Sequence, residues 1–131
     1  MSYRVLIVDD NATIRNLVRS SIERNREWEV CGEAENGRLA VEKVRQLHPD
    51  VVILDLQMPV MNGLEAARQI IRLHPNMAMV MLTMHNCAQL LRDAQAAGIK
   101  DVVSKSDGSL NDLLASLRNV VPDSNLKSRT R

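Results

Sequence analysis

Residues 50–55 read Asp50-Val51-Val52-Ile53-Leu54-Asp55, a run of four apolar residues with an aspartate at each end. Three of the four apolar residues are β-branched, and the run is too short for a helix. Such a run predicts a strand that is buried on both faces, as in a parallel sheet. The same stretch therefore indicates the class of fold and places a carboxylate directly after a strand.

On both sides of this run, short apolar segments alternate with longer segments whose apolar residues recur with the period of a helix. This alternation is typical of βα units around a parallel sheet. We expect strands at residues 3–8, 28–32, 51–54, 77–82 and 101–104. We expect helices at about 11–25, 37–47, 63–73, 87–97 and 109–121. The sequence thus predicts an α/β fold with five strands and five helices.

Local signals support the helix ends. Leu47-His48-Pro49 and Leu73-His74-Pro75 each close a predicted helix just before a strand, and proline cannot continue a helix. We interpret both histidines as C-terminal helix residues that the helix dipole favours. Gly98 is expected to adopt a left-handed conformation after the fourth helix.

Length and composition fit one soluble domain. The chain has 131 residues, of which 45% are hydrophobic and 25% charged. We expect a single domain over residues 1–121, followed by a polar, basic tail or linker stub at 122–131. Because no apolar stretch is long enough for a signal peptide or a membrane span, we expect a cytoplasmic protein that does not engage membranes.

Composition also argues against several ligand classes. The net charge of +1 gives no overall field that would recruit nucleic acid. With one Tyr, one Trp and no Phe, the chain lacks aromatic side chains on which single-stranded bases could stack. Cys31 and Cys87 form no metal-binding motif, and we interpret them as reduced, partly buried thiols, with a disulfide or a reactive thiol as the alternative.

Polar side chains follow four of the predicted strands. Asp9 and Asp10 come after the first strand and Asp55 after the third, whereas Thr83 and Lys105 follow the fourth and fifth. Because the carboxyl ends of parallel strands meet at one edge of a sheet, we expect these side chains to lie close together. Taken singly, each has an ordinary structural interpretation as a helix cap or a surface charge.

Three carboxylates at one edge repel one another unless a cation lies among them. Oxygen ligands without nearby His or Cys suit Mg²⁺, and a lysine ammonium with a threonine hydroxyl supplies donors for a phosphoryl group. We therefore predict a magnesium-dependent phosphoryl-transfer site. Asp55, which follows the central strand, is our candidate for the residue that takes the phosphoryl group.

The chain resembles the receiver domains of response regulators, the CheY-like phosphoacceptor modules of two-component signalling. The resemblance covers residues 3 to about 121. It rests on residues 5–10, Val-Leu-Ile-Val-Asp-Asp; on residues 50–55 with Met58-Pro59 and Asn62-Gly63; and on Leu82-Thr83 and Val103-Ser104-Lys105. It implies a doubly wound, flavodoxin-like parallel sheet with strand order 2-1-3-4-5.

The resemblance also implies a role for each matching residue. Asp55 is the expected phosphoacceptor, Thr83 donates its hydroxyl to a phosphoryl oxygen, and Lys105 pairs with Asp55 and then with the phosphate. For Mg²⁺, it implies ligation by Asp10, by Asp55 and by the main-chain carbonyl of Gln57, with Asp9 acting through water. Asn62-Gly63 is expected to open the third helix near the acceptor, and its plain interpretation as a turn is satisfied equally.

The sequence departs from the family pattern at three places around the site. Val102 replaces the usual aromatic residue before the lysine, Ser106 replaces a frequent proline, and Met84 is bulky where a small residue is common. Gln57 and His85 occupy positions that influence the hydrolytic water in receivers. Two alternatives therefore stay open: an interaction module that works without phosphorylation, and a magnesium-dependent phosphatase with an aspartyl intermediate.

The resemblance implies partners as well. A sensor histidine kinase or a phosphotransfer protein is the expected phosphoryl donor, and the chain is expected to act as a phosphoacceptor rather than as an enzyme on other substrates. Phosphorylation is expected to favour a homodimer, through helices one and five or helices four and five. A weaker resemblance to the NarL/FixJ-like group raises the alternative of a fused DNA-binding output domain that is absent from these residues.

Overall fold

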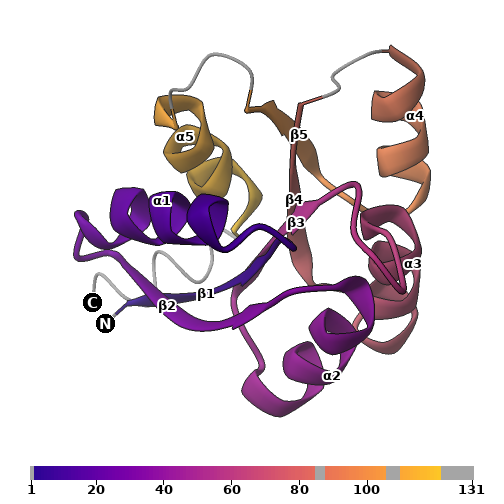
Figure 1. Cartoon of the computed structure of the whole chain (residues 1–131), viewed down its shortest axis with the longest axis horizontal. Helices are drawn as coiled ribbons and strands as arrows, with labels where there is room; N and C mark the ends of the chain where they lie inside the picture. The colour runs from indigo at the N-terminus through magenta and orange to yellow at the C-terminus, as the bar shows by residue number, and fades with distance from the viewer. Residues whose placement is uncertain (1, 85–87, 106–109, 122–131) are drawn as a thin grey trace.

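The computed structural model describes residues 2–84, 88–105 and 110–121, and its strands and helices alternate along the chain (Figure 1). The strands are β1 (Tyr3–Val8), β2 (Trp28–Ala34), β3 (Val51–Asp55), β4 (Ala78–Thr83) and β5 (Asp101–Ser104). The helices are α1 (Ala12–Glu23), α2 (Gly37–Leu47), α3 (Gly63–Leu73), α4 (Ala88–Ala96) and α5 (Asn111–Val120). Within the described ranges, the predicted order of elements is confirmed.

The strands form one parallel sheet in the order β2-β1-β3-β4-β5, as the resemblance implied. Helices α1 and α5 cover one face of the sheet, and α2, α3 and α4 cover the other (Figure 1). Every residue of the central strands β3 and β4 is buried, which is why both read as continuous apolar runs. The predicted doubly wound α/β fold is therefore confirmed.

Three helices begin with the same capping chemistry. The side chains of Asn11, Asn36 and Asn62 accept hydrogen bonds from main-chain N–H groups in the first turns of α1, α2 and α3. These bonds satisfy donors that a helix N-terminus otherwise leaves without partners. Two of these caps, Asn11 and Asn62, lie beside the carboxyl edge of the sheet, so capping also fixes the loops that carry the site.

The predicted helix ends are confirmed as well. Helices α2 and α3 end at Leu47 and Leu73, and His48 and His74 are their C-terminal caps. His48 has a positive φ of 49°, and Gly98 after α4 has a φ of 94°. A helix-C-terminal left-handed residue turns the chain toward the next strand.

Strand β2 is longer than predicted, because it extends to Ala34 rather than to residue 32. Its pairing with β1 shifts between Val5 and Leu6, whose partners are Val30 and Gly32, so Cys31 stands outside the register as a bulge. A bulge changes which residues face the core, and this breaks the alternation of side chains on which the sequence prediction depends. The extension is important because it places Glu33 beside the end of β1.

No helix within the described ranges is both long and apolar enough to cross a membrane. Residues 85–87, 106–109 and 122–131 lie outside the described residues. The expectations for Cys87, His85, Ser106 and the basic tail at 122–131 fall on these segments.

Candidate functional site

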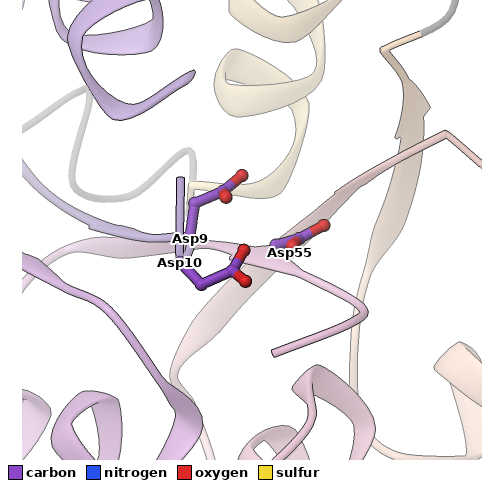
Figure 2. Close-up of side chains that lie close together, drawn as sticks. All are labelled: Asp9, Asp10 and Asp55. Carbon is purple, nitrogen blue, oxygen red and sulfur yellow. The ribbon is translucent and has the colours of Figure 1, made fainter. Parts of the chain in front are cut away.

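Three aspartates converge at the carboxyl edge of the sheet, as predicted. Asp9 and Asp10 follow β1, and Asp55 is the last residue of β3. One carboxylate oxygen from each lies within 4.8 Å of the other two. Figure 2 shows the three side chains pointing toward the same side of the strand ends. Asp9 and Asp55 are buried, with 3% and 8% of their surface exposed, whereas Asp10 is open to solvent.

Lys105 joins two of these carboxylates. Its Nζ atom donates to Oδ2 of Asp9 at 2.8 Å and to Oδ1 of Asp55 at 3.0 Å. The lysine is held from the other side as well, because its main-chain N–H donates to the carbonyl of Thr83 at 2.8 Å. The side chain of Lys105 is only 11% exposed, so the two ion pairs are partly shielded from water.

The electrostatic balance of the site is visible in its pKa values. Burial raises the pKa of Asp55, and the Asp9 carboxylate raises it further, although the hydrogen bond from Lys105 acts in the opposite direction. Burial alone would lower the pKa of Lys105, but its hydrogen bonds to Asp9 and Asp55 outweigh burial and raise it. Burial is thus the largest cause of the raised pKa of Asp55, and the hydrogen bond from Lys105 offsets it only in part.

The cluster lies in an open pocket. The residues that line it are Asp9, Asp10, Asn11, Ile14, Asp55, Gln57, Thr83, Met84 and Lys105. Thr83 is the last residue of β4 and is almost fully buried, while Gln57 and Met84 are exposed at the rim. The structure thus brings together every residue that the sequence predicted for the site.

The loop after β3 packs closely on the end of that strand. The N–H of Gly63 donates to the carbonyl of Leu56 at 2.8 Å. A Cβ atom at position 63 would lie 2.2 Å from the main-chain oxygen of Asp55, far inside any permitted contact. Glycine is therefore required here by close backbone approach, and it lets α3 start directly beside the main chain of Asp55.

The residues present fit a divalent cation. Three carboxylates from two neighbouring strand ends supply hard oxygen ligands, and the exposed Asp10 leaves one side of the cluster accessible to water. Three carboxylates gather here around the Lys105 ammonium, which bonds to two of them, so the cluster keeps a negative balance that a divalent cation would offset. The donor set and the charge balance agree with the predicted Mg²⁺.

Two features of the site were not predicted. The family resemblance implied that Lys105 pairs with Asp55, but it did not imply the bond of Lys105 to Asp9. It also missed Arg15 and Glu33, which connect α1 and β2 to the main chain at Asp9. No periodicity or motif marks these two residues, because the contact depends on the bulge that places Glu33 beside the end of β1.

The departures from the family pattern are also located. Val102 is partly buried and packs against the apolar cluster under α2, α3 and α4. Met84 is 59% exposed and lines the pocket, so this bulky side chain lies at the entrance to the acidic cluster.

Comparison with known proteins gives one consistent result. The family model described as the response regulator receiver domain matches residues 5–118. The chemotaxis protein CheY of Thermotoga maritima is 41% identical over 105 residues, which are 80% of this chain and 87% of that protein.

Solved structures agree. The response regulator domain of Thermotoga maritima CheB superimposes with a TM-score of 0.85 at 29% identity, over 92% of this chain and 96% of that one. CheY in the CheX-CheY-BeF3-Mg+2 complex from Borrelia burgdorferi superimposes with a TM-score of 0.82 at 26% identity, over 90% and 88% of the two chains. Several other relatives are protein-glutamate methylesterases, of whose length the chain spans about a third.

Proposed function

The chain belongs to the response regulator receiver family, and we propose that it receives a phosphoryl group on Asp55 and thereby switches partner binding or an output domain in two-component signalling. The observation that carries this proposal is the Lys105 ammonium shared between Asp9 and Asp55 at one end of a parallel sheet. This arrangement keeps a carboxylate nucleophile beside positive charge in a pocket open to a donor.

The proposed reaction is phosphoryl transfer from a phosphohistidine. A carboxylate oxygen of Asp55 attacks phosphorus, an O–P bond forms, the P–N bond breaks, and its electron pair stays on the imidazole nitrogen of the donor. Lys105 and Thr83 both line the pocket, and their ammonium and hydroxyl donate to the phosphoryl oxygens, whose charge must be stabilised during transfer.

Asp9, Asp10, Asp55 and the main-chain carbonyl of Gln57 are the groups that would hold Mg²⁺, with Asp9 acting through water. When bound, the ion supplies positive charge that shields the Asp55 carboxylate from the incoming phosphate. Apart from its own phosphorylation and dephosphorylation, we assign no enzymatic activity to the chain.

The expected donor is a sensor histidine kinase or a phosphotransfer protein, which must present its phosphohistidine to the pocket. A homodimer is the second partner that we propose. Between α1 and α5 runs a groove with a mainly apolar lining, Ile14, Leu17, Val18, Ser21, Arg24, Asn25, Arg26, Leu82, Lys105, Leu110 and Leu114. Lys105 and Ile14 line both the groove and the acidic pocket, so the groove is continuous with the site. We therefore propose that the dimer forms through the α1–α5 face rather than through the α4–α5 face.

The two alternatives predict different chemistry. A magnesium-dependent phosphatase of the aspartyl type typically has an acidic residue two positions after its nucleophile, where this chain has Gln57. An interaction module without phosphorylation would retain the fold but would form no adduct at Asp55.

The deciding experiment is incubation with Mg²⁺ and acetyl phosphate, followed by intact-mass and peptide-mass measurement. We expect one added phosphoryl group on Asp55, lost in Asp55→Asn. Asp50→Asn is the matched control, because Asp50 precedes the same strand and its side chain accepts from the Arg4 N–H, an interaction that asparagine can retain. An unmodified wild-type protein would favour the interaction module, and steady turnover of phosphate esters would favour the phosphatase.

A further inference from the structure

Arg15, in the first turns of α1, reaches the main chain of the acidic site. Its Nη1 donates to the carbonyl oxygen of Asp9 at 2.7 Å, and its Nε donates to Oε1 of Glu33 at 2.9 Å. The side chain is only 17% exposed. One guanidinium therefore connects the strand end that carries Asp9 and Asp10 to β2.

Every polar group of Asp9 has a hydrogen-bond partner, so the position of this residue is fixed. Its N–H donates to the carbonyl of Ala34 at 3.0 Å, its Oδ1 accepts from the N–H of Asn11 at 2.9 Å, and its Oδ2 accepts from Lys105. The carbonyl that Arg15 binds belongs to the peptide between Asp9 and Asp10. Because a peptide group is planar, fixing this carbonyl also fixes the direction in which the chain enters Asp10.

Glu33 anchors Arg15. Its Oε2 accepts from Arg19, with Nε at 2.9 Å and Nη2 at 2.7 Å, so both carboxylate oxygens are occupied. The contacts from both arginines restrict the Glu33 carboxylate to one orientation. Arg19 also lies on α1 and also pairs with Glu23, and within the described ranges no hydrogen bond joins it to Asp9.

We propose that Arg15 is a positioning residue for the divalent cation, because it fixes the Asp9–Asp10 peptide so that the acidic side chains face one another before the ion arrives. The inference rests on the proposed function, since it concerns the same site. Partners beyond the direct ligands of a metal commonly set the orientation of those ligands, and their loss weakens metal binding.

If Arg15 has this role, the effect of removing it on Mg²⁺ affinity is opposite to the effect that its charge alone would produce. Arg15 and Arg19 each carry a positive charge that repels Mg²⁺, so removing either charge alone should strengthen Mg²⁺ binding. If Arg15 positions the peptide, Arg15→Met instead weakens Mg²⁺ binding. Arg19→Met is the matched control, because it removes the same charge and a bond to the same Glu33 carboxylate but leaves the Asp9 carbonyl contact in place.

The test is titration of the unphosphorylated wild type, R15M and R19M with MgCl2, followed through the main-chain amide NMR signals of Asp10 and Leu56. We expect R15M to bind Mg²⁺ about ten-fold more weakly than wild type, and R19M to bind as tightly as wild type or slightly more tightly. The Asp10 amide should shift in metal-free R15M but not in metal-free R19M. Thermal unfolding of both variants checks that the fold persists.

The inference is overturned if R15M binds Mg²⁺ at least as tightly as R19M while the wild type binds it, an outcome that leaves the proposed function intact. Failure of the wild type to bind Mg²⁺ would count against the proposed function itself and against the inference with it. Should R15M not fold, Arg15→Lys and Arg19→Lys replace the pair. We then expect only R15K to lose affinity, since an ammonium lacks the fork that joins Glu33 to Asp9.

Discussion

The Nζ atom of Lys105 lies 2.8 Å from Oδ2 of Asp9, slightly closer than the 3.0 Å that separates it from Oδ1 of Asp55. The lysine is therefore a counter-ion shared by Asp9 and Asp55 rather than a partner of Asp55 alone. A phosphoryl group on Asp55 would compete with Asp9 for the same ammonium, and this competition links modification of β3 to the loop after β1.

Lys105→Met should destabilise the protein at neutral pH. The change leaves the buried Asp9 and Asp55 carboxylates without their shared cation, and breaking such a pair costs about 3 kcal/mol. Urea unfolding at pH 7 measures the loss, and Mg²⁺ should restore part of it. Lys100→Met is the control, because Lys100 is exposed. A K105M protein as stable as K100M would contradict the shared-cation role.

Asp55→Asn should stabilise the metal-free protein while abolishing the phosphoryl adduct. Burial first, and then the Asp9 carboxylate, raise the pKa of Asp55, so its charged form costs free energy in the folded state. For a carboxyl group with a raised pKa, stability is lost as pH rises through the unfolded and then the folded pKa. At pH 7 we expect D55N to gain about 1 kcal/mol in unfolding free energy, measured by denaturant titration without Mg²⁺. A less stable D55N would show that the Lys105 pair outweighs the burial cost.

Gly63→Ala should be costly because the added Cβ meets backbone. The atom that it would strike is the main-chain oxygen of Asp55, which cannot move without displacing the end of β3. We expect a loss of about 3 kcal/mol, at the upper end for overpacking, and slower labelling by acetyl phosphate. Gly32→Ala is the comparison, since its Cβ would meet the movable end of the Leu47 side chain. Equal losses in G63A and G32A would contradict this explanation.

Protonation of Glu33 in mild acid should lower the stability of the protein. Burial alone would raise the pKa of this carboxyl, but the hydrogen bonds from Arg19 and Arg15 outweigh burial and lower the pKa below its usual 4.5. A carboxyl group with a lowered pKa contributes stability above its unfolded pKa and loses it as pH falls through the folded pKa. We expect Glu33→Gln to reduce the fall in melting temperature below pH 4.5, compared with wild type. If the melting temperature of the variant depends on pH in the same way as that of wild type, Glu33 is not the source of the acid sensitivity.

The α1–α5 groove allows the proposed homodimer to be tested by mutation. Leu17 on α1 is 55% exposed and lines the groove, whereas Leu73 at the end of α3 is 59% exposed on the opposite face. If phosphorylation favours a dimer through α1 and α5, Leu17→Ser should weaken it and Leu73→Ser should not. Sedimentation of both variants with Mg²⁺ and beryllofluoride provides the measurement. A wild-type protein that sediments as a monomer under these conditions at high concentration would count against the dimer.

Much of the fold could be predicted because the signals are local. The β-branched run at 51–54, the helical period of the segments between the strands and the Leu-His-Pro helix ends each depend on neighbours in the chain. The position of Asp55 after a buried strand then implied a place at the carboxyl edge, since parallel strands share their direction. These arguments need no knowledge of distant contacts.

The sequence by itself determined the class of fold, the strand ends and the residue types gathered there, because backbone geometry turns a residue's place after a parallel strand into a place at one edge. Only the tertiary structure decided how those residues are partnered. The bulge at Cys31 shifts the register of β2 so that Glu33 lies where Arg15 can bond to it and to the Asp9 carbonyl. Lys105 is shared between Asp9 and Asp55. Such partnerships follow from distances between segments far apart in the chain, which no local periodicity encodes.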